Sequence, residues 1–188
     1  MVTVAVAADS PRRRAAAEDW AAFERLVRAH HEALRLFAYR LIHDAAAVDD
    51  VLQEAYLKAF RAFPRFASRP DAPKAWLFRI VYRCGLDELD RRRRWERRQS
   101  RAELTRPPAE RGLAETTAER DAVARALDAL APEERAAVVL VDGIGLDYAS
   151  AAAVVGVRRG TIASRLNRAR SALRVSLRHD GVVEPSDA

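Results

Sequence analysis

A run of arginines without a single acidic residue lies between Gly156 and Arg178. Its arginines are Arg158, Arg159, Arg165, Arg168, Arg170, Arg174 and Arg178. Apolar residues recur between them at intervals of three and four, which predicts one stripe of an amphipathic helix. The stripe consists of Ile162, Leu166, Ala169, Leu173 and Leu177. Guanidinium groups grip phosphates and guanine edges in a forked geometry. This segment is therefore predicted to bind a polyanion.

A second, shorter helix is predicted just before this one, over Tyr148 to Val155, with Asp147 as its N-cap and a tight turn at Gly156-Val157. Two helices joined by a short glycine-containing turn, the second of them basic, are typical of a helix-turn-helix whose second helix enters the DNA major groove. The candidate DNA contacts there are Arg158, Arg159, Thr161, Ser164, Arg165 and Arg168. A basic amphipathic helix can also be plain solvated surface, or can bind acidic membranes or partner proteins.

A second basic segment combines arginines with aromatic rings. The pattern predicts a helix from Lys74 to about Arg94, and the run RRRRWERR, Arg91 to Arg98, extends it. Trp76, Tyr82 and Trp95 lie among these arginines. Rings on which bases stack, interleaved with cations, suit an opened nucleic-acid strand, although such a charge run is often only solvated.

An acidic segment precedes it. Asp44 is a predicted N-cap for a helix from Ala45 to Phe63, ended by Pro64. Polar residues gather on the outer side of its first half, namely Asp49, Asp50, Gln53 and Glu54. They either complement the helix dipole or form an acidic docking face for a protein partner.

Composition narrows the classes of function. The chain has 188 residues, a net charge of +6 and a pI of about 10.2, which suits a polyanionic partner. Cys84, the single cysteine, fits a small core residue, and the four histidines show no ligand spacing with it, so we expect no metal and no cofactor. No phosphate loop or nucleophile elbow appears, so we expect no enzyme. The longest apolar runs are too short for membrane insertion, and the start is too short for a signal peptide, so we expect a cytoplasmic protein.

These elements predict an all-α protein of two small helical domains joined by a flexible linker, the second domain being the helix-turn-helix. Another helix, from Trp20 to Ile42, buries one face in the first domain. That face consists of Trp20, Phe23, Leu26, Val27, Leu34, Phe37, Ala38 and Leu41. The expected boundaries are a disordered arm over 1–17, a first domain over 18–96, a linker over 97–115, a second domain over 116–178 and a tail over 179–188.

In this order, the segments resemble bacterial RNA polymerase sigma factors of the extracytoplasmic-function (ECF) group. VDDVLQEAYLKAF, Val48 to Phe60, is similar to the family's core-binding helix. AWLFRIVYRCGLDELDRRRR, Ala75 to Arg94, is similar to the helix that meets the minus-ten promoter element. Leu127 to Arg174 is similar to the domain that meets the minus-thirty-five element, most specifically in GTIASRLNRARSAL.

The resemblance implies a sigma factor that binds core RNA polymerase and directs promoter-specific transcription initiation in response to stress or envelope signals. It assigns Asp49, Asp50, Gln53 and Glu54 to polymerase binding. It assigns Trp76, Arg79, Arg83, Asp87, Arg91 and Arg92 to the minus-ten element, with a base pocket near the Pro64–Pro73 loop. The helix-turn-helix residues would then meet the minus-thirty-five element. The partners implied are core polymerase and promoter DNA, and the family is often held by an anti-sigma factor.

The sequence departs from the family at Arg83, Asp90, Ala149, Ser150 and Ala163, which bears on promoter preference. The alternative hypothesis is an autonomous helix-turn-helix regulator that binds operators without polymerase. That hypothesis does not explain the acidic helix or the arginine-aromatic helix.

Overall fold

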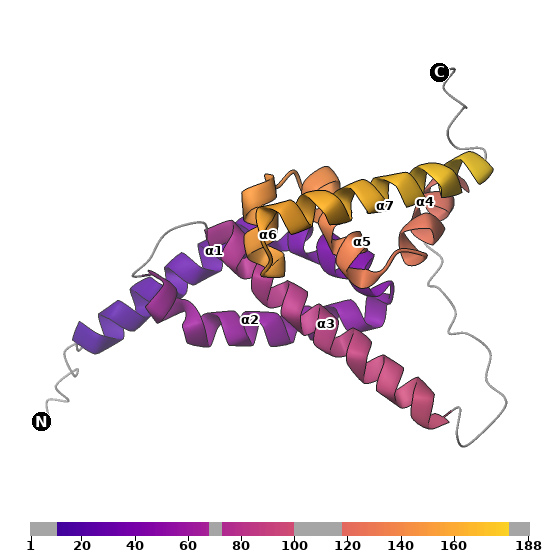
Figure 1. Cartoon of the computed structure of the whole chain (residues 1–188). Helices are drawn as coiled ribbons and strands as arrows, with labels where there is room; N and C mark the ends of the chain where they lie inside the picture. The colour runs from indigo at the N-terminus through magenta and orange to yellow at the C-terminus, as the bar shows by residue number, and fades with distance from the viewer. Residues whose placement is uncertain (1–10, 68–72, 100–117, 181–188) are drawn as a thin grey trace, which may run out of the picture.

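The structure, a computed structural model, describes residues 11–67, 73–99 and 118–180, and helices make up almost all of these ranges (Figure 1). In order they are α1 (Pro11–Ile42), α2 (Ala45–Ala67), α3 (Pro73–Gln99), α4 (Ala118–Asp128), α5 (Pro132–Val138), the π-helical turn η1 (Val139–Gly143), α6 (Tyr148–Val155) and α7 (Arg159–His179). No strand occurs in these ranges. The predicted all-α class is confirmed.

Helix α1 begins earlier than predicted from the sequence. It starts at Pro11, not Trp20, so residues 11–17 of the expected arm are helical. A proline is tolerated in the first turn, and the arginines and alanines that follow it are strong helix formers. Residues 1–10 lie outside the described part of the chain.

Helix α2 continues past the proline that was expected to end it. It runs to Ala67, with Pro64 inside it. An internal proline costs a helix roughly 3 kcal/mol. Packing offsets that cost, because Phe63 is buried and the Phe66 ring stacks on Trp76 of α3, with centroids 4.2 Å apart.

The first three helices form one bundle around a shared apolar core. Leu34 and Phe37 of α1 and Phe78 of α3 are fully buried there. Helix α1 passes close to α3 at Gly85, where an added Cβ would lie 2.7 Å from Cδ2 of Leu41. Trp20, predicted to be buried, is 52% exposed: its ring packs against Phe23 and Phe60, and Phe60 is itself 39% exposed, so these rings lie at the margin of the core.

The second bundle is built around α7. The predicted apolar stripe is buried at Ile162, Leu166 and Ala169, and half-buried at Leu173 and Leu177. Pro132 is the first residue of α5, and the helix then widens into η1, which ends at Gly143. Helices α4 and α5 both pack against α7.

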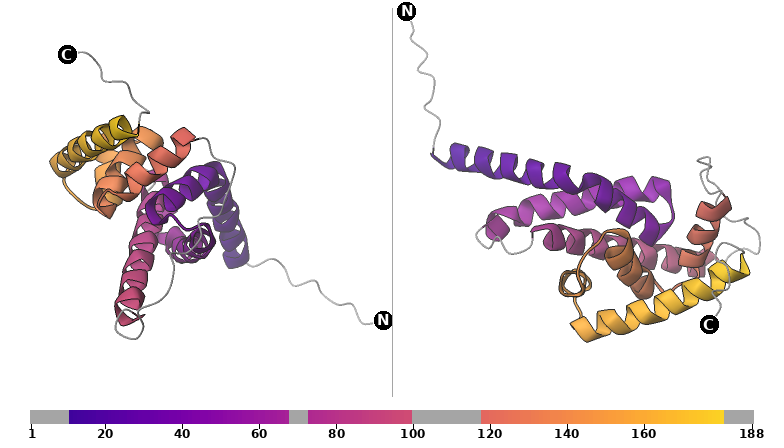
Figure 2. Two further views of the ribbon diagram at one scale, coloured as in Figure 1. Left: turned by 90° about the vertical axis from the view of Figure 1, so that its right-hand side faces the viewer. Right: turned by 90° about the horizontal axis from the view of Figure 1, so that it is seen from above.

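The two bundles lie directly against each other (Figure 2). Helix α6 packs on α3, and α5 packs on α1, so the buried apolar residues of both bundles form one continuous cluster. The last turns of α3 extend away from this body (Figure 1). Arg97 to Gln99 of the expected linker complete α3, and residues 100–117 lie outside the described ranges, as do residues 181–188 of the expected tail.

Candidate nucleic-acid interface

The helix-turn-helix is fixed by local hydrogen bonds at its corners. The Asp147 carboxylate accepts hydrogen bonds from the backbone N–H of Ala149 at 2.8 Å and of Ser150 at 2.9 Å, which confirms it as the N-cap of α6. The hydrogen bonds from Ser150 lower the pKa of Asp147. Gly156 ends α6 with φ at 79°, a left-handed conformation in which glycine carries no Cβ penalty. Helix α7 follows after two further residues.

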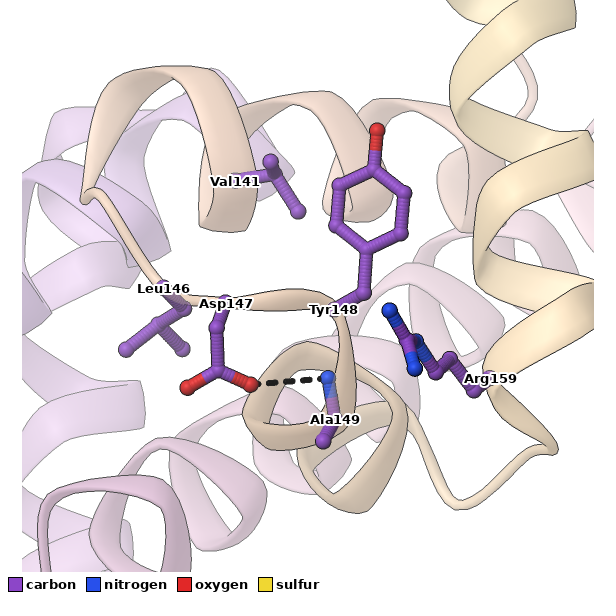
Figure 3. Close-up of a pocket in the computed structure, with 6 residues that line it drawn as sticks. All are labelled: Val141, Leu146, Asp147, Tyr148, Ala149 and Arg159. Atoms are coloured by element: carbon purple, nitrogen blue, oxygen red, sulfur yellow. Dashed lines mark hydrogen bonds between the residues drawn. The ribbon is translucent and has the colours of Figure 1, made fainter.

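An open depression lies beside this corner (Figure 3). Its lining residues are Val141, Leu146, Asp147, Tyr148, Ala149 and Arg159. Figure 3 shows Tyr148 and Arg159 on one side of it and Leu146 on the other. Among the predicted DNA contacts only Arg159 borders this surface, so the depression adds an apolar flank to the start of the basic helix.

Most predicted contacts of α7 lie on its accessible side. Arg158, Arg159 and Ser164 are exposed, and Thr161 is half-buried. The Ser164 hydroxyl donates to the Thr161 carbonyl oxygen at 3.0 Å. Arg168 is exposed and forms an ion pair, in which its Nε donates a hydrogen bond to the Glu134 carboxylate of α5 at 2.7 Å.

Arg165 differs from the other residues of this set. It is half-buried, and its Nη1 atom is enclosed without a hydrogen-bond partner among the described residues. Its charge acts on Tyr82 of α3: burial raises the pKa of Tyr82, Glu133 adds to the rise and Arg165 opposes it. In this conformation, Arg165 therefore lies near α3 and is only partly available to solvent.

The predicted residues of α3 divide into two groups. Arg79, Arg83 and Asp87 are exposed, and Asp87 lies 3.8 Å from Nζ of Lys58. Trp76 is half-buried, with one face covered by Phe66. The base pocket predicted near the Pro64–Pro73 loop falls largely on residues 68–72, outside the described residues.

Arg91 and Arg92 both pair with Glu88, which is buried, while the Arg91 side chain is exposed and that of Arg92 is half-buried. Both arginines contact the Glu88 carboxylate, and Arg92 Nε lies 2.6 Å from it. Arg92 also reaches Asp44 at 2.7 Å, which ties α3 to the turn between α1 and α2. Arg92 therefore has a structural role here, which its place in a run of arginines did not reveal.

The acidic set of α2 is exposed as predicted. Asp49, Asp50, Gln53 and Glu54 all face outward, and Glu54 pairs with Lys58 at 2.7 Å. Leu57 and Phe60, 52% and 39% exposed, continue this side of the helix. The spacing from Gln53 to Leu57 and Phe60 could have identified them from the sequence.

A polar cluster between the two bundles was not predicted. Arg135 of α5 is only 8% exposed. It donates hydrogen bonds to the carbonyl oxygens of Asp128 and Leu130 in its own bundle and of Leu41 in the other. His43 contacts both Arg135 and the Asp128 carboxylate, and Arg135 itself lies 3.6 Å from that carboxylate. Leu41 and His43 lie more than 80 residues from their partners in the second bundle, so no local pattern indicates these contacts.

No group of three or more potential metal ligands occurs within the described ranges. None of the helices described is long and apolar enough to cross a bilayer.

Two family models match the chain. Residues 26–95 match Sigma-70 region 2, and residues 120–173 match Sigma-70, region 4. The chain is 41% identical over 162 residues to the ECF RNA polymerase sigma factor SigM of Mycobacterium tuberculosis, covering 84% of this chain and 78% of SigM. It is 35% identical over 170 residues to the ECF sigma factor SigE of Mycolicibacterium smegmatis, covering 88% of this chain but only 64% of SigE.

Solved structures are similar as well. The sigma factor RpoE of Bartonella quintana, crystallised with the anti-sigma factor NepR, matches with a TM-score of 0.69 at 29% identity, covering 83% of this chain and 96% of that one. CnrH, in complex with the cytosolic domain of CnrY, matches with a TM-score of 0.64 at 29% identity, covering 89% of this chain and 94% of that one.

Proposed function

This chain belongs to the ECF group of RNA polymerase sigma factors, and on that premise we propose how its helices share the work of transcription initiation. Helix α2 binds core RNA polymerase, α3 binds the minus-ten element and α7 binds the minus-thirty-five element. The family is not enzymatic, so the chain's own task is to bring polymerase to promoters. The observation that carries the proposal is the presence of three differently charged surfaces in the order of the family's regions.

Helix α7 suits the major groove. Arg158, Arg159 and Ser164 are exposed near its start, where a recognition helix contacts base edges. Its arginines supply phosphate contacts, and the buried stripe leaves this side of the helix open. Ala163 offers only a methyl group, so base reading depends on the residues around it.

Helix α3 suits an opened strand. Arg79 and Arg83 are exposed and can hold the backbone, while Trp76 is a ring close to them in the sequence. Because Arg91 and Arg92 are held by Glu88, the main backbone contacts in this proposal fall to Arg79 and Arg83.

Helix α2 suits a polymerase surface that presents cations around an apolar patch. Asp49, Asp50 and Glu54 provide the charge, which steers association and fixes the register. Leu57 and Phe60 provide exposed apolar area beside it, where binding energy concentrates.

The test is transcription in vitro with core polymerase on a library of genomic fragments. The expected result is a set of transcripts whose start sites share two upstream elements. A complete absence of such transcripts would refute the proposed function. A gel shift distinguishes the autonomous regulator: that protein would bind duplex operators tightly alone, whereas this chain should bind a promoter well only with core polymerase.

An anti-sigma factor is a further proposed partner. RpoE was crystallised with one, and CnrH with the cytosolic domain of CnrY. By the same likeness, we propose that the chain acts in the cytoplasm, where it meets polymerase. Affinity capture from cells should recover polymerase together with one small additional protein, and its absence under every growth condition would remove that partner.

A further inference from the structure

We infer that the far end of α3 is a phosphate-binding site for the DNA duplex that lies between the two promoter elements. The site consists of Arg94, Arg97 and Arg98, beyond the residues proposed to meet the minus-ten element. The identity of this DNA rests on the proposed function, because the two elements define the stretch between them. The binding of duplex by these arginines can be measured independently of any promoter.

The last turns of α3 project from the body of the molecule (Figure 1), and residues 93–99 are all exposed. Residues 91–93 each contact an acidic residue of α3. In contrast, Arg94, Arg97 and Arg98 form no ion pair with any residue of the described ranges. The Nε of Arg98 donates to the carbonyl oxygen of Arg94 at 3.2 Å, which leaves the other N–H groups of this guanidinium able to bind a phosphate.

The free arginines continue the side of α3 that carries Arg83. At about 100° of rotation per residue, Arg83, Arg94 and Arg98 lie within roughly 60° of one another around the helix axis. Fifteen residues separate Arg83 from Arg98, and at about 1.5 Å per residue this is roughly 22 Å. That length corresponds to about six or seven base pairs of duplex. If Arg83 holds the backbone of the minus-ten element, Arg98 therefore reaches DNA beyond that contact.

The acidic residues nearby do not neutralise this line of arginines. Glu96 lies on the opposite side of the helix, two residues or about 200° from Arg94. Asp87 and Asp90 lie on the same side, but Asp87 is 3.8 Å from Lys58 and Asp90 is paired with another arginine of α3 at 3.9 Å. The positive charge at the end of the helix therefore stays available to a polyanion.

A duplex fits this surface better than an opened strand. Opened strands are bound by aromatic rings on which successive bases stack. Trp95 is the only ring among residues 91–99, and it lies about 100° around the helix from Arg94, so a strand stacked on it would not follow the arginines. A duplex backbone requires only cations at the phosphates.

Chain connectivity indicates which duplex this is. The two elements are centred roughly 25 base pairs apart, or roughly 85 Å at about 3.4 Å per base pair. Nineteen peptide links join Gln99 to Ala118, where the second domain begins, and they extend by at most roughly 65 Å. Because this connection is shorter than the separation, the end of α3 belongs on the upstream side of the minus-ten element, next to the intervening duplex.

The first test compares the full chain with the double variant Arg94→Gln/Arg98→Gln, without polymerase. Fluorescence anisotropy measures binding to a labelled random 30-base-pair duplex at several salt concentrations, starting low because such binding is weak. Each lost phosphate contact lowers the slope of log affinity against log salt by about 0.9, so the slope should fall by about two. Glutamine is a good helix former, and circular dichroism checks that helix content is retained.

The matched control is Arg25→Gln/Arg61→Gln, which removes the same charge from exposed positions on α1 and α2 and should leave the slope unchanged. Equal slopes for the wild type and the α3 variant would overturn the site. A similar fall for both variants would also overturn it, because only net charge would then matter. If the α3 variant loses as much affinity for a 30-residue oligothymidine as for the duplex, the site binds opened strands and the inference is wrong.

The second test locates the DNA. Cys84, the single cysteine, is buried, so an iron chelate can be attached selectively to Gln99→Cys. In the complex with core polymerase, on a promoter recovered from the transcription test, hydroxyl radicals should cut the duplex immediately upstream of the minus-ten element. Cuts only downstream of that element, or no cuts, would overturn the assignment. A wild type that yields no promoter-specific transcripts refutes the proposed function, whereas the salt slopes still decide whether the arginines bind duplex.

Discussion

At the scale of single residues, the arginines of α3 and α7 share one chemistry and differ in what they contact. Arg79 and Arg83 are exposed, Arg92 is committed to Asp44 and Glu88, and Arg165 lies near Tyr82. An arginine held by two carboxylates is a poor phosphate ligand, because binding DNA would leave a buried glutamate unpaired.

Arg165→Ala should weaken promoter recognition by the polymerase complex by about 1–3 kcal/mol if Arg165 reads a base edge. Competition between promoter variants measures the effect at each position of the minus-thirty-five element. Arg178→Ala, an exposed arginine at the far end of α7, is the control for general electrostatics. A loss of equal size for every promoter sequence would instead identify Arg165 as a phosphate contact.

Asp44→Ala should lower the free energy of unfolding by about 1 kcal/mol at neutral pH, because α2 loses its N-cap. Burial alone would raise the pKa of Asp44, but hydrogen bonds from the backbone N–H of Ala47 and from Arg92 hold it below its ordinary value of 3.8. Because the pKa of Asp44 is lower in the folded chain than in the unfolded chain, the ionised carboxylate stabilises the fold at pH values above its ordinary pKa. This stabilisation is lost as the pH falls through the pKa of the folded state. Denaturant unfolding at pH 7 and at pH 3 should therefore show a difference that shrinks in acid, and a constant difference would contradict this account.

The residues that cap the helices were predictable from the sequence, but the surroundings of Arg165 were not. Asp44, Asp147 and Gly156 act on residues within a few positions, so their types already determine their roles. The environment of Arg165 depends on a helix some 80 residues earlier, and an amphipathic pattern on α7 contains no information about that neighbour.

At the scale of elements, the helices were predicted better than their ends. Periodic apolar stripes indicated every long helix, because burial on one face is what a helix of this kind requires. Pro64 was taken as a stop signal, yet α2 continues because Phe66 stacks on Trp76. Tertiary contacts of this kind override local propensity, and the local sequence does not show them.

Asp50→Arg should abolish binding to core polymerase and leave the fold intact, since Asp50 is exposed on α2 and the change reverses its charge. A pull-down with core enzyme measures binding, and a thermal melt confirms folding. Asp90→Arg makes the same reversal on the exposed side of α3 and should retain polymerase. Unchanged capture by Asp50→Arg would show that the docking face lies elsewhere.

At the scale of the whole molecule, the apolar cores of the two bundles are continuous. The sequence indicated two domains because a proline-containing stretch of low periodicity separates two helical patterns. Whether two domains joined in this way contact each other depends on the complementarity of surfaces that are far apart in the chain. The periodic pattern of apolar residues within a helix does not indicate such complementarity. The order of regions could therefore be predicted, and the closure of α6 on α3 could not.

Differential scanning calorimetry should show one unfolding transition for the wild-type chain, because a continuous core unfolds cooperatively. Arg135→Met should separate this into two transitions, one for each bundle. Two resolved transitions already present in the wild type would contradict the cooperative closure.

The packing of α6 against α3 has a consequence for modularity. The helix-turn-helix must fit two surfaces, the DNA groove through α7 and helix α3 through α6, so the two halves of the chain are not interchangeable parts. A chimera that combines residues 1–99 of this chain with the second domain of a relative such as SigM would keep a complete promoter-reading domain and lose the matched inner face. The two bundles of such a hybrid should pack less tightly than those of this chain, because their facing surfaces come from different sequences.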